Sequence, residues 1–107
     1  CDQCARPVAP HELELPHGFI PADGDQLRTA PGCRACRNTG YRGRLGVFEM
    51  LRMTDACREL VMHRANATEL AATATREGAL HTLLADGFAK ARLGKTTLSE
   101  VVRALVT

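Results

Sequence analysis

Four cysteines near the start of this chain form two Cys-x-x-Cys pairs. Cys1 and Cys4 are the first pair, Cys33 and Cys36 are the second, and 28 residues separate them. A single pair is compatible with a redox centre, half of a disulfide framework or half of a metal site. Two such turns supply the four thiolates of a tetrahedral Zn²⁺ site, with Zn–S distances near ~2.3 Å. We therefore predict a structural zinc site at these four residues, with no open position for a catalytic water.

Three other arrangements compete with this four-thiolate site. Two disulfides would suit a secreted domain, but a fifth cysteine, Cys57, and the lack of a secretory signal weaken that interpretation. A thioredoxin-like centre needs one pair at a helix N-terminus after a strand, and neither pair lies in such a position. His11 and His17 lie in the spacer between the two pairs (residues 5–32), and each could replace one cysteine as a ligand.

Cys57 lies on an apolar helical stripe and is predicted to be a small core residue.

Arginine is concentrated around the second cysteine pair. Residues 28–52 contain six arginines and one acidic residue, whereas residues 1–27 contain one arginine and five acidic residues. With Tyr41 and Phe48 nearby, this stretch is compatible with a zinc ribbon that binds nucleic acid through Arg34, Arg37, Arg42 and Arg44. The formal charge is only +2, however, and four thiolates with one Zn²⁺ would bring it to about zero. We therefore expect no nucleic-acid partner, and we predict that Phe48 is a core residue and that Tyr41 packs over the second pair.

Familiar catalytic motifs are missing from the sequence. It contains no G-x-x-x-x-G-K-[ST] phosphate loop, no G-x-G-x-x-G and no H-E-x-x-H. The one serine, Ser99, lies in a predicted helix cap, and His63 and His81 are predicted on helices as surface or half-buried residues. There is no apolar run long enough to predict a membrane span. We expect that this chain is not an enzyme by itself and, because it begins with Cys instead of Met, that it is part of a longer protein.

The first half of the chain is rich in residues that interrupt helices. Residues 1–50 hold all five prolines and six of the nine glycines, which excludes long helices there. The segment PHELEL predicts a short helix with Pro10 in its first turn, and GFIPADGDQ predicts a loop. The segment GRLGVFEML predicts a strand that is well buried near Val47 and Phe48.

The second half predicts four short helices. Thr54 is the expected N-cap of the first, and capping boxes that begin at Asn66 and Thr97 precede the second and the fourth. Gly78 and Gly94 suit the ends of the second and third helices. Apolar residues at helical spacing define the faces of the first, third and fourth helices: Cys57, Leu60 and Val61; Leu80, Leu84, Phe88 and Ala91; Leu98, Val101, Val102 and Leu105.

These patterns together predict a small α+β protein. Residues 1–50 are expected to form an irregular zinc-knuckle subdomain with a short strand or hairpin. Residues 51–107 are expected to form a C-terminal helical subdomain, a bundle of about four short α-helices.

The cysteine pairs and the residues after them resemble one family. The segment CRACRNTGYRGRLGVFEML is similar to the C-terminal tetracysteine region of type II secretion and type IV pilus assembly ATPases, which reads C-x-x-C-x-x-TGY-x-GR-x-G-x-x-E. The matching positions here are Cys33, Cys36, Thr39, Gly40, Tyr41, Gly43, Arg44, Gly46 and Glu49. The family's closing helices are matched at Glu77, Gly78, Leu83, Asp86, Gly87, Gly94, Thr96 and Thr97. Asp2, in place of a frequent proline, and Cys57 depart from the pattern.

This resemblance implies a role for the chain and its cysteines. Cys1, Cys4, Cys33 and Cys36 would bind zinc, in a non-catalytic C-terminal module of a hexameric motor ATPase. ATP and Mg²⁺ would bind in an ATPase domain upstream of Cys1. The implied partners are the ATPase core, neighbouring subunits and an inner-membrane platform protein, which places the motor at the cytoplasmic face of the inner membrane. Arg44 is the one arginine in the family pattern, so we expect it to make a specific contact.

Overall fold

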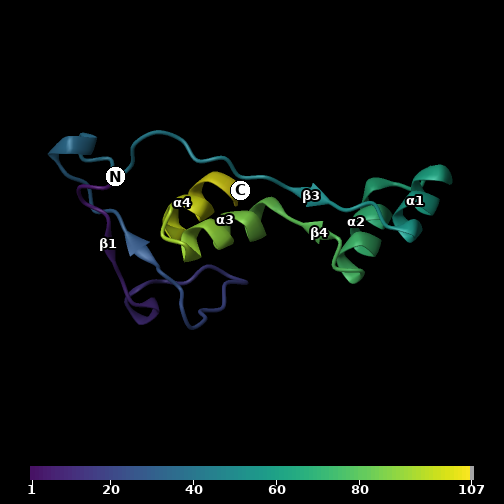
Figure 1. Cartoon of the computed structure of the whole chain (residues 1–107), viewed down its shortest axis with the longest axis horizontal. Coiled ribbons are helices and arrows are strands. Elements are labelled where there is room, and N and C mark those ends of the chain that lie inside the picture. The colour runs from purple at the N-terminus through teal and green to yellow at the C-terminus, as the bar shows by residue number, and fades with distance from the viewer. Residues whose placement is uncertain (107) are drawn as a thin grey trace.

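The computed structural model describes residues 1–106. These residues form an elongated molecule with extents of 56 × 27 × 21 Å. The cysteine-rich segment lies at one end, helices α3 (Leu83–Arg92) and α4 (Leu98–Leu105) lie next to it, and α1 (Asp55–Met62) and α2 (Ala67–Arg76) lie at the far end (Figure 1). The predicted α+β class with four short helices is confirmed.

The four helices pack as two pairs, each with its own core. Helix α1 packs on α2, and α3 packs on α4. The core of the α3–α4 pair consists of Phe19, Leu27, Phe88, Ala91, Leu98 and Val101. The core of the α1–α2 pair consists of Cys57, Ala74 and Ala79. The radius of gyration is accordingly 17.2 Å, where a compact chain of this length has about 13 Å.

The larger core joins the N-terminal segment to the last two helices. The Phe19 ring meets the Phe88 ring edge to face, with 5.3 Å between centroids. Arg92 of α3 also contacts Phe19. Its guanidinium lies over the ring, 4.2 Å from the centroid, and pairs with Asp25 at 2.6 Å. The division of the chain near residue 50 stays a prediction, and residues on both sides of it pack together here.

The N-caps predicted at Thr54, Asn66 and Thr97 are confirmed. The side chains of Thr54, Asn66 and Thr97 each accept a hydrogen bond from the backbone N–H three residues further on. Gly78 and Gly94 follow the ends of α2 and α3 with φ of 66° and 74°, a left-handed conformation that glycine adopts without steric cost.

Two pairs of very short strands hold the irregular segments together. Strand β1 (Arg6–Pro7) pairs antiparallel with β2 (Arg28–Thr29). Strand β3 (Met50–Leu51) pairs antiparallel with β4 (Leu80–His81), at the base of the α1–α2 pair (Figure 1). A 3₁₀ helix at Pro10–Glu12, with Pro10 in its first turn, confirms the predicted short helix.

The strand predicted for residues 43–51 is wrong except at Met50 and Leu51. The segment before them is irregular, Val47 is half-buried, and Phe48 is 67% exposed, so Phe48 is not a core residue. In the same way, Val61 on the predicted stripe of α1 is exposed. Apolar sequence alone predicted burial at these positions, but burial depends on packing by other elements, which is partial at Val47 and slight at Phe48 and Val61.

The predicted start of the third helix is also wrong. Leu80 and His81 were predicted on this helix, but they form β4, because their backbone pairs with Met50 and Leu51. The helix begins at Leu83 with Thr82 as its N-cap. None of the helices in the described part of the chain is both long enough and apolar enough to span a membrane.

Candidate metal centre

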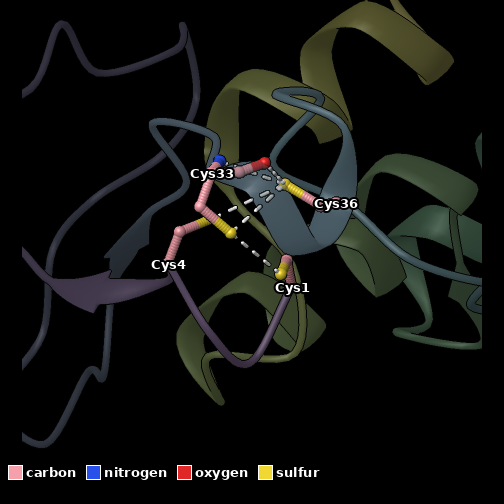
Figure 2. A group of neighbouring side chains, drawn as sticks. All are labelled: Cys1, Cys4, Cys33 and Cys36. Carbon is pink, nitrogen blue, oxygen red and sulfur yellow. Dashed lines mark hydrogen bonds between the residues drawn. The ribbon is translucent and has the colours of Figure 1, made fainter.

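The two Cys-x-x-Cys pairs come together because β1 and β2 pair. Cys1 and Cys4 lie just before β1, and Cys33 and Cys36 lie on a 3₁₀ turn (Arg34–Cys36) shortly after β2. The backbone nitrogen of Cys1 also donates a hydrogen bond of 2.8 Å to the carbonyl oxygen of Gly40. Figure 2 shows the four side chains converging from these two segments.

The four sulfur atoms lie at the corners of a small tetrahedron. All of them lie within 4.8 Å of one another. The Sγ–Sγ distances are 3.8 Å for Cys1–Cys33, 3.9 Å for Cys4–Cys36 and 3.8 Å for Cys33–Cys36. Tetrahedral zinc with Zn–S bonds near 2.3 Å requires S–S separations of about 3.8 Å, whereas a disulfide has about 2.05 Å. All five cysteines are free thiols. The donor set therefore fits a metal ion and not a disulfide framework.

The backbone after Cys33 turns tightly around the sulfur of Cys36. Arg37 and Asn38 have φ of 57° and 62°, and the Asn38 N–H donates to the Cys33 carbonyl oxygen at 2.7 Å. The sulfur of Cys36 accepts two backbone hydrogen bonds, from Cys33 N–H at 3.3 Å and from Gly40 N–H at 3.1 Å. Backbone dipoles aimed at this sulfur stabilise the thiolate that a metal needs.

The thiols of the centre differ in how readily they ionise. Burial opposes ionisation of Cys36, but the N–H groups of Cys33 and Gly40 outweigh it and lower the pKa of Cys36 to about 6. At Cys4, burial raises the pKa of the thiol. A metal ion competes with protons for thiolates. Cys36 is therefore better prepared than Cys4 to bind a metal near neutral pH.

Gly40→Ala is expected to disrupt this centre. Gly40 is buried with φ of 87°, and a Cβ there would lie 2.5 Å from the backbone oxygen of Ala30. We expect a loss of about 2 kcal/mol or more in the free energy of unfolding, together with weaker metal retention. Chemical denaturation and metal analysis would measure both effects.

Gly43→Ala is the matched control for this prediction. Gly43 also has a positive φ, 71°, but no atom lies within 4 Å of the position of a Cβ there. It should cost only the backbone strain, about 1 kcal/mol. Equal losses in the two variants would show that the close approach of Gly40 to Ala30 is unimportant.

The other residues singled out in the sequence lie outside the sulfur cluster. His11 and His17 are exposed and do not belong to it. Cys57 is fully buried in the α1–α2 core, which confirms its predicted place. Exposed arginines surround the second cysteine pair, and none forms an ion pair with another described residue: Arg34, Arg37, Arg42 and Arg44. The specific contact expected of Arg44 stays a prediction.

One contact of the turn that follows Cys36 could not be predicted from the spacing of residues in the sequence. The Tyr41 hydroxyl lies 2.6 Å from Oγ1 of Thr97, the N-cap of α4. Thr97 is itself buried, and its Oγ1 accepts from the Glu100 N–H. The turn after Cys36 is thus attached to the start of the last helix. The sequence marked Thr97 as a cap, but nothing in it indicated a partner 56 positions away.

Comparison with known proteins places this arrangement in context. A family model described as type II/IV secretion system protein matches residues 1–103. The chain is 37% identical over 108 residues to the type IV pilus assembly ATPase PilB of Acinetobacter baylyi, covering 96% of this chain and 18% of the relative. It is 44% identical over 106 residues to PilB of Myxococcus xanthus, covering 95% and 19%. It is 36% identical over 103 residues to the type II secretion system protein E of Pectobacterium carotovorum, covering 96% and 20%. The chain thus spans about a fifth of the length of these relatives.

Proposed function

This chain belongs to the type II/IV secretion system protein family, and we propose that it is the non-catalytic C-terminal module of a motor ATPase. One observation carries the proposal: it matches pilus assembly ATPases along almost its whole length while spanning about a fifth of theirs. Its sequence has no phosphate loop to hold ATP. In this proposal ATP and Mg²⁺ bind in the upstream ATPase domain, and the parent protein couples ATP hydrolysis to protein secretion or pilus assembly.

The sulfur cluster is proposed to hold a structural Zn²⁺ ion. Cys1, Cys4, Cys33 and Cys36 would be its ligands, as their sulfur spacing and the preference of zinc for thiolates favour. Four thiolates leave no coordination position for a water or a substrate, so the ion would stabilise the fold without catalysing a reaction. When bound, the ion would link the segment of Cys1 and Cys4 to the segment of Cys33 and Cys36 more firmly than the two-residue strands β1 and β2 do by themselves.

The module is proposed to act through its surfaces. Its partners in this proposal are the ATPase core of the parent chain, neighbouring subunits of a hexamer and an inner-membrane platform protein. The parent would accordingly work in the cytoplasm, at the inner membrane. Part of the support is the elongated shape, which leaves apolar side chains such as Phe48 and Met62 uncovered.

Two measurements on the purified chain test this function. It should contain one zinc ion per chain by mass spectrometry, and it should not hydrolyse ATP under conditions in which the parent protein does. ATP hydrolysis by the 107-residue chain alone would contradict the non-catalytic role.

The alternative function is a zinc ribbon that binds nucleic acid through its exposed arginines. Binding to single-stranded RNA or DNA at low salt, lost steeply as salt increases, would favour that alternative.

A further inference from the structure

The α1–α2 pair extends from the rest of the molecule on two paired segments. We call residues 50–81 the arm; it contains β3, α1, α2 and β4, and Figure 1 shows it as a narrow projection beyond α3. The buried residues of the arm core around Cys57 and those of the larger core around Phe88 are separate sets among the described residues. A continuous apolar core therefore does not hold the arm in place, and its position depends on contacts at its base.

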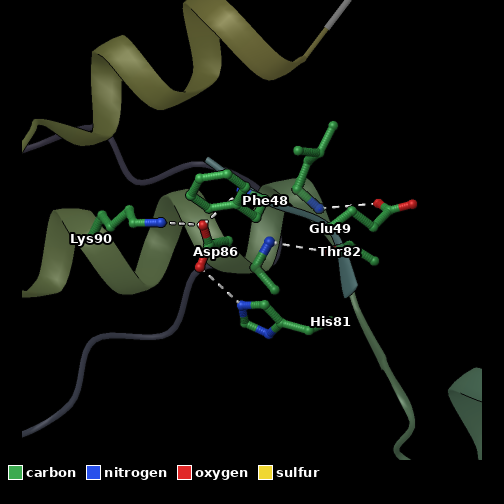
Figure 3. A network of polar contacts seen from close by, with 8 residues as sticks. Phe48, Glu49, His81, Thr82, Asp86 and Lys90 are labelled. Atoms are coloured by element: carbon green, nitrogen blue, oxygen red, sulfur yellow. Dashed lines mark hydrogen bonds and ion pairs between the residues drawn. The ribbon is translucent and has the colours of Figure 1, made fainter. Parts of the chain in front are cut away.

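Asp86, in the first turn of α3, contacts both segments that lead into the arm (Figure 3). Its Oδ2 accepts a hydrogen bond of 2.9 Å from the N–H of Phe48, just before β3. Its Oδ1 lies 3.2 Å from Nε2 of His81, in β4. Lys90, one turn further along α3, donates to Oδ2 as well. A single carboxylate thus connects the entering segment, the leaving segment and the helix.

The contacts of Asp86 are strong because the carboxylate is charged and largely shielded from water. Its side chain is 17% exposed, and the hydrogen bonds from Lys90 and from the Phe48 N–H lower its pKa to about 2. Hydrogen bonds to an ionised acceptor are roughly twice as strong as neutral ones. Nearby, the Lys90 ammonium lies 5.1 Å from the centroid of the Phe48 ring, and Glu49 Oε2 accepts from the Leu83 N–H at 3.1 Å.

We propose that Asp86 positions the arm relative to α3 by tying Phe48 and His81 to that helix. The competing explanation is purely local: an acidic residue in the first turn stabilises a helix, and it pairs with a lysine four residues later. Glu100 illustrates the local role, because it lies in the first turn of α4 and pairs with Arg103 on the same helix. Asp86 differs from Glu100 in that it also contacts residues of both segments at the base of the arm.

This positioning decides where the arm presents its apolar surface. Four large apolar side chains of the arm are exposed: Met50, Met53, Val61 and Met62. If the base of the arm opens, these side chains move relative to α3 and to the metal centre. The inference goes beyond the role as a motor module and does not depend on which metal the cysteines bind.

The test measures the distance between the arm and α4. Spin labels are attached through a ketone-bearing unnatural amino acid at Ala72 in α2 and Ala104 in α4, both exposed, so that the cysteines stay unlabelled. Pulsed electron resonance should give one narrow distance distribution for the unmodified sequence. In Asp86→Ala it should become roughly twofold broader while the helical circular dichroism is retained. Exchange of the Phe48 amide hydrogen should become about tenfold faster.

Glu100→Gln is the control for a purely local role, since it removes the charge of a first-turn carboxylate that has only local partners. Its distance distribution should equal that of the unmodified chain. An unchanged width in a folded Asp86→Ala variant, or equal broadening in Glu100→Gln, overturns the proposal. If Asp86→Ala does not fold, the exchange rate of the Phe48 amide hydrogen in the unmodified chain tests the proposal instead. Exchange about tenfold slower than the unprotected rate supports the hydrogen bond from Phe48 to Asp86, and exchange at the unprotected rate contradicts it.

Discussion

Cys33→Ser should lose the bound metal and unfold at a much lower temperature than the unmodified chain. Its Sγ lies 3.8 Å from the sulfurs of both Cys1 and Cys36, so the substitution removes a donor at the middle of the cluster. The binding energy of a structural zinc site is also folding energy and amounts to about 10 kcal/mol or more. That is comparable with the whole stability of a small domain.

Amide hydrogen exchange should show where the Cys33→Ser variant has unfolded. Residues 1–8 and 28–41 should exchange much faster, because without the metal they are held by the two-residue strands β1 and β2 and by a few contacts such as that of Tyr41 with Thr97. Helices α1 and α2 should keep most of their protection, since their core is separate. Zinc content and thermal unfolding complete the measurement.

Cys57→Ala is the control for this variant, because it removes a thiol that is buried outside the sulfur cluster. It should keep one metal ion per chain and lose only a modest amount of stability. If Cys33→Ser kept its full zinc content and its melting temperature, the structural role of the site would be disproved.

Phe88→Ala should cost about 3–5 kcal/mol in the free energy of unfolding. Phe88 is 9% exposed, and its ring contacts the ring of Phe19 in the N-terminal segment edge to face. The truncation leaves a cavity among the core residues of the N-terminal segment, α3 and α4 that pack with Phe88. Urea unfolding followed by circular dichroism would measure the loss.

Phe48→Ala makes the same chemical change at an exposed position. Phe48 is 67% exposed, and its ring contact is with Lys90. This variant should lose less than about 1 kcal/mol, which is the usual size of an exposed cation–π contact. A Phe48→Ala loss as large as that of Phe88→Ala would mean that Phe48 lies in a core, as its sequence context predicted.

Features that depend on a few neighbouring residues could be predicted from the sequence. The caps at Thr54, Asn66 and Thr97 join a side chain to a backbone N–H three positions away, so the residue type at one position is sufficient. Gly78 and Gly94 were predicted as helix ends for a similar reason, because a positive φ there favours glycine. The Cys-x-x-Cys spacing likewise brings two sulfurs onto one turn.

Burial and long-range pairing could not be predicted in this way. Val47 and Phe48 have the composition of a buried strand, but burial depends on how other elements pack over them, and Val47 is only half-buried while Phe48 is exposed. Leu80 continues the apolar spacing of α3, yet backbone pairing with Leu51 placed it in β4. Thr82 could have been recognised as the N-cap of α3 from its type, had Leu80 not extended the helical pattern beyond it.

Residue type at short or regular spacing was enough to predict the cysteines of the candidate metal centre, the family and the existence of four helices. How these parts are joined depends on contacts that exist only in the folded chain. The contact between Tyr41 and Thr97 and the hydrogen bond from the Phe48 N–H to Asp86 connect residues whose types are common and whose separations follow no pattern. They form only when the chain has folded, since a hydrogen bond between distant residues must overcome the entropy of closing the loop between them.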